Sequence, residues 1–86
     1  MRIELKKFGE LLISRPAGHE AFLVFFSAFK PKNPDEKIEL DFSGVKVLAP
    51  SWADEFISNI KEKFPNPVVF IPSNNASVIE SLKFVK

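Results

Sequence analysis

The chain has 86 residues, a formal net charge of +1 and no cysteine. This length accommodates one domain, residues 1–86, and leaves no room for a second independent core. The 12 Lys and Arg residues nearly balance the 11 Asp and Glu residues, which argues against generic binding of DNA or RNA, because that binding needs an excess of positive charge. The absence of cysteine excludes disulfides and thiolate metal sites.

The aromatic residues are unusual in kind, since ten Phe and one Trp occur without any Tyr. Rings without a polar group are best used in packing, so we expect a dense, filled core. No apolar run approaches the ~20 residues that span a bilayer, and residues 1–4 do not begin a signal peptide. We therefore expect a cytoplasmic protein that does not bind a membrane.

The first half of the chain predicts two strands and a helix. Ile3 and Leu5 alternate with charged residues, and the apolar run 11–13 follows Gly9, a pattern that predicts an opening β-hairpin. Pro16 favours a helix that begins near residues 17–19. Inside that helix, phenylalanines at helical spacing predict a buried stripe, which consists of Phe22, Phe25, Phe26 and Phe29.

The second half predicts two strands and two helices. Residues 38–42 alternate as in a half-buried strand, and Ser51 with Asp54 predicts a helix N-cap and capping box. The apolar run 68–71 between two prolines predicts a central strand, and Val78, Ile79 and Leu82 predict a final helix. The order β-β-α-β-α-β-α predicts an α/β domain, with a mixed sheet of about four strands covered by three helices.

The sequence offers few residues for catalysis. His19 is the single histidine, so one chain cannot build a multi-histidine metal site, and a helix-capping or exposed role is expected for it. The three glycines are isolated and match no nucleotide-binding fingerprint. We expect no metal, no cofactor and no catalytic residue. An enzyme would need a polar pocket around His19, with Arg15 or Asp54 nearby.

One segment carries a sharper signal. Asp41-Phe42-Ser43-Gly44-Val45, followed by Ser51-Trp52-Ala53-Asp54-Glu55-Phe56, with Ser14-Arg15 upstream, reads as a strand, a turn and a capped helix. This arrangement resembles stand-alone STAS-like domains of unknown function, which are related to the STAS domains of anti-sigma factor antagonists. The resemblance covers roughly residues 3 to 82 and implies a single STAS-like domain.

The resemblance implies a site at Ser51, which stands where partner kinases phosphorylate anti-sigma factor antagonists. The pattern departs from those antagonists at Ala49-Pro50-Ser51-Trp52, which replaces an Asp-Ser-Ser-Gly run. From the residues alone, Ser51 could instead serve only as a cap, Trp52 could fold over the loop, and Arg15 could bind an anion or extend along the surface. The predicted partner surface consists of Arg15, Asp41, Ser43, Gly44, Ser51, Trp52, Asp54 and Glu55.

These observations predict a non-enzymatic protein-interaction or regulatory module. The partner would be another protein, such as an ATPase-type kinase or regulator. Two alternatives stay open: a homodimer that associates through the apolar first helix at Leu23, Val24 and Phe25, and a small enzyme centred on His19.

Overall fold

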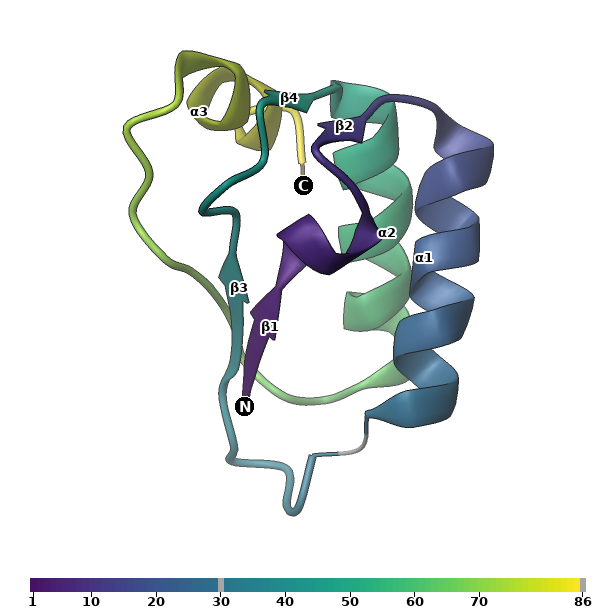
Figure 1. Cartoon of the computed structure of the whole chain (residues 1–86). Helices are drawn as coiled ribbons and strands as arrows, with labels where there is room; N and C mark the ends of the chain where they lie inside the picture. Colours follow the sequence, from purple (N-terminus) through teal and green to yellow (C-terminus); the bar gives the residue numbers. More distant parts are fainter. Residues whose placement is uncertain (30, 86) are drawn as a thin grey trace.

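The computed structural model describes residues 1–29 and 31–85 (Figure 1). In this part of the chain, five strands occur with three α-helices and one 3₁₀ helix. In order, they are β1 (Arg2–Glu4), the 3₁₀ helix η1 (Leu5–Phe8), β2 (Leu11–Leu12), α1 (Arg15–Ala28), β3 (Ile38–Asp41), β4 (Val47–Leu48), α2 (Pro50–Lys63), β5 (Val68–Phe70) and α3 (Ala76–Leu82). The predicted α/β class is confirmed.

The strands form two separate parallel sheets. β1, β3 and β5 pair in that spatial order, with Ile3 beside Leu40 and Leu40 beside Phe70. β2 pairs with β4, so that Leu11 lies beside Val47. The predicted mixed sheet of about four strands is therefore wrong, because the described residues form five strands and every pairing is parallel.

The predicted β-hairpin at the start of the chain is also wrong. β1 ends at Glu4, and the chain then turns into η1, which buries Leu5 completely. Gly9 closes this turn with φ of 125°, a conformation that favours glycine. Alternation marks a strand without choosing its partner, and tertiary packing pairs β1 and β2 with strands more than 30 positions later.

β5 lies at an edge of its sheet, whereas β3 is central, so the predicted central position of residues 68–71 is wrong. All three side chains of β5 are half-buried. The apolar run thus reflects partial burial of the side chains of β5. It does not imply that a strand lies on each side of β5.

α1 and α2 lie side by side on the same side of the three-stranded sheet (Figure 1). The Phe25 ring meets the Phe56 ring edge-on, at 6.0 Å between centroids. One face of α2 is apolar and packs in the core, because Ala53, Phe56, Ile57 and Ile60 are buried and Phe64 packs partly against the core. Contacts between the two helices therefore supply much of the hydrophobic core.

α1 begins earlier and buries less than the sequence predicts. The Ser14 hydroxyl accepts a hydrogen bond from the Ala17 N–H at 3.2 Å, so the helix starts at Arg15 and not at residues 17–19. Phe22 and Phe25 are buried, but 44% of Phe26 is exposed. Phe26 stacks on the outside of Phe22, so the predicted stripe is one residue too wide.

α3 confirms the predicted final helix and is anchored to β4 by hydroxyl groups. The Asn75 side chain caps α3 by accepting from the Ser77 N–H at 2.8 Å. The Ser77 hydroxyl accepts from the Leu48 N–H at 3.0 Å, and the Ser81 hydroxyl donates to the Leu48 carbonyl. These bonds hold the end of the chain beside β4.

Gly18 permits the close approach of α1 to α2. A Cβ atom at this position would lie 2.8 Å from the Trp52 carbonyl oxygen and 3.2 Å from the Trp52 Cα. Both contacts are to backbone, which cannot move aside without separating the helices. We expect Gly18→Ala to lower the free energy of unfolding by about 1–2 kcal/mol, despite the better helix propensity of alanine.

Urea unfolding followed by circular dichroism measures this effect. Ser27→Ala, at an exposed position of the same helix, is the control and should change stability by no more than about 0.5 kcal/mol. A Gly18→Ala protein more stable than wild type would contradict the close approach.

Candidate functional site

The segment from Asp41 to Asp54 runs from the end of β3 to the first turn of α2, past β4. Gly44 turns the chain with φ of 86°. The Asn75 side chain donates to the carbonyl oxygens of Val45 and Lys46, both at 3.0 Å. The loop is thereby tied to the start of α3, which gives the residues around Ser51 a defined position.

Asp41 is buried, so its predicted place in the partner surface is wrong. Its Oδ2 accepts from the Arg2 Nη2 at 2.6 Å, and its Oδ1 accepts from the Ser43 N–H at 2.9 Å. These hydrogen bonds, first that from Arg2, lower the pKa of Asp41 from 3.8 to about 2. Asp41 therefore stabilises the β1–β3 pair and the turn after it. Ser43 and Gly44, which belong to the same predicted surface, are exposed.

Ser51 lies in the first turn of α2 but does not cap it. The helix begins at Pro50, and Ala49 is the N-cap without a side-chain hydrogen bond, so the predicted cap and capping box are wrong. Proline suits the first helical position because its missing N–H has no helical partner there. The Ser51 hydroxyl instead donates to the Ile13 carbonyl oxygen at 3.0 Å, and Ser51 is half-buried.

Trp52 is part of the core, with 1% of its surface exposed. Its ring stacks on Phe56 at 5.0 Å between centroids and lies 6.3 Å from Phe8. Its predicted role in the partner surface is therefore wrong, and the alternative in which it folds inward is correct. The helical period explains this, because Trp52, Phe56 and Ile60 share one face of α2.

A polar cluster joins the first turns of α1 and α2. The Arg15 Nη1 donates to the Asp54 Oδ2 and to the Glu55 Oε1, both at 3.1 Å. The His19 Nδ1 lies 3.1 Å from the Glu55 Oε2, and the Asn59 amide donates to the same oxygen at 2.9 Å. The hydrogen bond from Arg15 lowers the pKa of Glu55.

The cluster brings together the residues that the enzyme alternative required. Arg15 is in contact with both neighbouring carboxylates, although Asp54 and Glu55 leave the helix in different directions. Arg15 and Asp54 line a hollow of the surface, but His19 does not. The cluster is a partly exposed hydrogen-bond network that links α1 to α2.

Exposed apolar side chains occur on β2, on β4 and beside Ser51. Leu11 and Val47 are register partners on β2 and β4, and Ile13 follows Leu11 by two positions, on the same side of the extended chain. Phe84, 66% exposed, lines a hollow of about 380 Å³ together with Arg15, Pro50, Ser51 and Asp54. We call Leu11, Ile13, Val47 and Phe84 the β2–β4 surface.

Sequence reasoning missed this surface. Phe84 follows α3 without a periodic pattern, and Leu11 and Ile13 belong to an apolar run whose buried member is Leu12. Successive side chains of a strand point to opposite faces, and this rule, applied to residues 11–13, could have placed Leu11 and Ile13 on the face opposite to Leu12.

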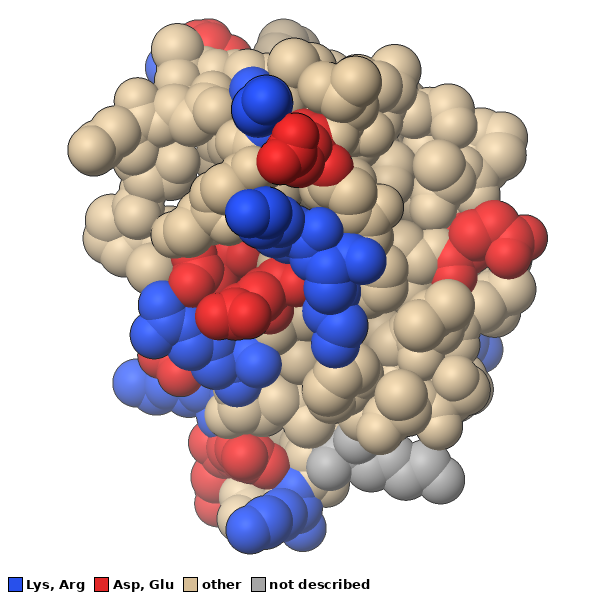
Figure 2. Space-filling view, in the orientation of Figure 1, with Lys and Arg blue, Asp and Glu red and all other residues tan. Residues whose placement is uncertain are grey.

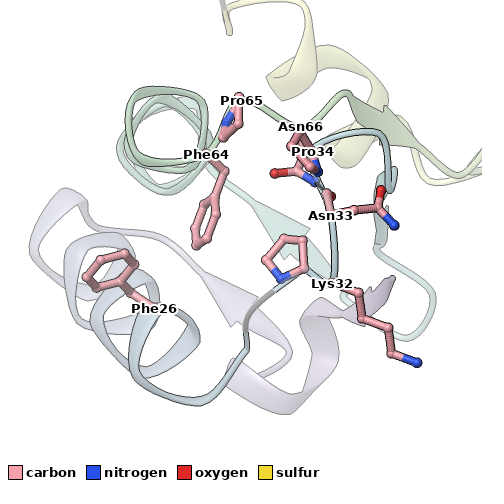
Figure 3. Close-up of a pocket in the computed structure, with 8 residues that line it drawn as sticks. Phe26, Lys32, Asn33, Pro34, Phe64, Pro65 and Asn66 are labelled. Atoms are coloured by element: carbon pink, nitrogen blue, oxygen red, sulfur yellow. Dashed lines mark hydrogen bonds between the residues drawn. The ribbon is translucent and has the colours of Figure 1, made fainter.

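A second hollow, of about 350 Å³, lies between the end of α1 and the segment after α2. Phe26 and Phe64 line one side of it, and Asn33, Pro34 and Asn66 approach from the other side, as Figure 3 shows. The Lys32 amine points away from the hollow (Figure 3). The lining is mostly apolar and brings no acid and base together.

Residues 1–29 and 31–85 contain no group of three His, Cys, Asp or Glu side chains placed to hold a metal ion. Over the same ranges, no helix has both the length and the apolar character needed to cross a membrane.

Comparison with known families gives one match. The sequence model of the family described as a STAS-like domain of unknown function matches residues 24–83. This range includes β3, β4, α2, β5 and α3, and thus the whole segment around Ser51. Comparisons with curated proteins and with solved structures gave no match.

Proposed function

The chain belongs to the family of STAS-like domains of unknown function, and from this premise we propose that it is a non-enzymatic protein-interaction module. Its docking site is the β2–β4 surface around Ser51, and its partner is another protein. The observation that carries the proposal is the exposure of four large apolar side chains, of which Phe84 lines the same hollow as Ser51 and Ile13 accepts the Ser51 hydroxyl at its carbonyl oxygen. Such patches on small domains are typical of interaction sites.

The composition of the surface fits a protein partner. Leu11 is 63% exposed and Phe84 is 66% exposed. A partner that covers these side chains removes their apolar surface from water, which favours binding. Arg15 and Asp54 border the hollow and supply the polar rim that interaction sites commonly have. An ATPase-type kinase or regulator is the partner class that the likeness to anti-sigma factor antagonists suggests.

Ser51 is the group through which we propose that binding is regulated. A phosphate there would carry about −1.5 to −2 charges in the first turn of a helix, where the dipole favours negative charge. It would attract Arg15, which now bonds to Asp54 and Glu55, and would repel Asp54. Phosphorylation would thus change the charge and the contacts of the surface without unfolding the domain.

The proposal assigns no catalytic residue. The Arg15 guanidinium, which borders the hollow beside Ser51, already makes hydrogen bonds to both Asp54 and Glu55. Glu55 in turn bonds to His19 and Asn59. In the proposed module this network aligns α1 with α2, so that Ser51 and Ile13 stay in contact.

The test is capture of a partner that depends on this surface. The full chain, with a photo-crosslinking residue at Val47, is incubated with extract of its source cells, and crosslinked proteins are identified by mass spectrometry. We expect a protein that is captured by wild type and lost with Phe84→Asp and with Ser51→Asp. A purified captured kinase should then add a phosphate to Ser51 and not to Ser51→Ala.

Val24→Asp is the matched control, because Val24 is an exposed apolar residue on α1, away from the β2–β4 surface. It should capture the same protein as wild type. Identical sets of captured proteins from wild type, Phe84→Asp and Ser51→Asp would refute the docking site. An unmodified Ser51 with surface-dependent capture would refute only the regulation.

A further inference from the structure

The outer edge of β5 presents unpaired backbone groups. The Ile38 N–H donates to the Pro67 carbonyl at 2.8 Å, and the Ile71 N–H donates to the Leu40 carbonyl at 3.0 Å. Because alternate residues of a strand bond to the same neighbour, Val68 and Phe70 direct their N–H and C=O groups away from β3. Within residues 1–29 and 31–85, these groups have no hydrogen-bond partner.

The two edges of the sheet differ in how they are protected. β1, the opposite edge, carries the charged side chains of Arg2 and Glu4 and continues into η1. The two edge strands are equally short, with three residues each, but charged side chains protect an edge against pairing with another chain. Figure 2 shows Lys, Arg, Asp and Glu gathered over β1 and η1. β5 has only Val68, Val69 and Phe70 and no charged residue.

We propose that the β5 edges of two copies of this chain pair in an antiparallel manner and join their three-stranded sheets into one. The pairing is centred on Val69, which meets the partner's Val69. The N–H and C=O of Val68 then bond to Phe70 of the partner subunit, and those of Phe70 bond to the partner's Val68. All the outward groups of Val68 and Phe70 are thereby satisfied by four main-chain hydrogen bonds.

The edge is suited to a second copy because it is self-complementary about Val69. A two-fold axis brings the same residues together from both copies, and no like charges meet there. A register centred on Phe70 would set Val68 opposite Pro72, which has no N–H to donate. Pro72 thus disfavours the register centred on Phe70, and a two-fold pair leaves no β5 edge for a third copy.

The dimer is weak and dissociates on dilution. Three residues from each copy make an interface well below the ~800 Å² per partner of a standard complex. The association is separate from the proposed docking site, because β5 contributes no residue to the β2–β4 surface. Failure of either proposal therefore leaves the other intact.

Cysteine trapping tests the register directly, since the natural chain has no cysteine. In the proposed pair, the two Val69 Cα atoms face each other at about 4.5 Å, as in a non-hydrogen-bonded antiparallel pair, which is within the range for a disulfide. We expect the Val69→Cys chain to form a disulfide-linked dimer under mild oxidation. Val24→Cys, an exposed position on α1, should stay monomeric under the same conditions.

Sedimentation equilibrium of chains without cysteine gives the second readout. Wild type should show a concentration-dependent dimer, and Val69→Thr, which keeps a β-branched side chain, should retain it. Val69→Lys should be monomeric, because like charges directly opposite each other oppose pairing. A wild-type monomer at about 1 mM, with no trapping of Val69→Cys, would overturn the proposal. Trapping of Val24→Cys in its place would assign the association to α1.

Discussion

Replacement of Trp52 by alanine is expected to lower the free energy of unfolding by about 3–5 kcal/mol. Trp52 is the largest of the fully buried side chains and stacks on Phe56. Its removal loses the contacts to Phe8 and Phe56 and leaves a cavity between η1 and α2. For a domain of this size, a loss of that magnitude is a large fraction of the total stability.

Urea unfolding measured by far-UV circular dichroism gives this value, because the variant has no tryptophan fluorescence. Trp52→Phe keeps an aromatic ring against Phe56, and we expect it to lose only roughly 1–2 kcal/mol. Phe84→Ala, which truncates an aromatic residue of the β2–β4 surface, is the matched surface control and should change stability by about 0.5 kcal/mol or less. Equal effects of Trp52→Ala and Phe84→Ala would contradict the burial of Trp52.

Replacement of Asp41 by asparagine is expected to cost about 2 kcal/mol near pH 7, which corresponds to the lowering of its pKa from 3.8 to about 2. The hydrogen bonds from Arg2 and Ser43 favour the carboxylate in the folded state. A pKa that is lower in the folded state stabilises the protein above the unfolded pKa. That contribution is lost as the pH falls from about 4 to about 2.

The measurement is the difference in stability between wild type and Asp41→Asn across this pH range. We expect a difference that is constant above about pH 5 and that approaches zero near pH 2. Asp35→Asn, at an exposed position, serves as the control and should differ from wild type by no more than about 0.5 kcal/mol. A difference that persists unchanged to pH 2 would show that the charge of Asp41 is not what stabilises the turn.

The candidate site could be located from the sequence, but its composition could not. The run from Asp41 to Phe56 indicated a strand, a turn and a helix with a hydroxyl at its start, and Ser51 does lie in the first turn of α2. Asp41 and Trp52 belong to the segment that resembles the STAS-like family, and the partner surface predicted from that resemblance therefore included them. Arg2, which covers Asp41, is 39 positions away in the sequence, so no local pattern could show that Asp41 is buried.

Local sequence predicted the three helices and four of the strands, but neither β4 nor the 3₁₀ helix η1. The spacing of phenylalanines predicted α1 and alternation predicted β3, because each of these signals arises among residues within one or two turns of one another. The partners of the strands were decided only by tertiary structure. β1 and β2 carry strand patterns that suit a hairpin, yet each pairs with a strand far along the chain. The physical reason is that strand pairing depends on which faces are buried together, and that depends on the whole chain.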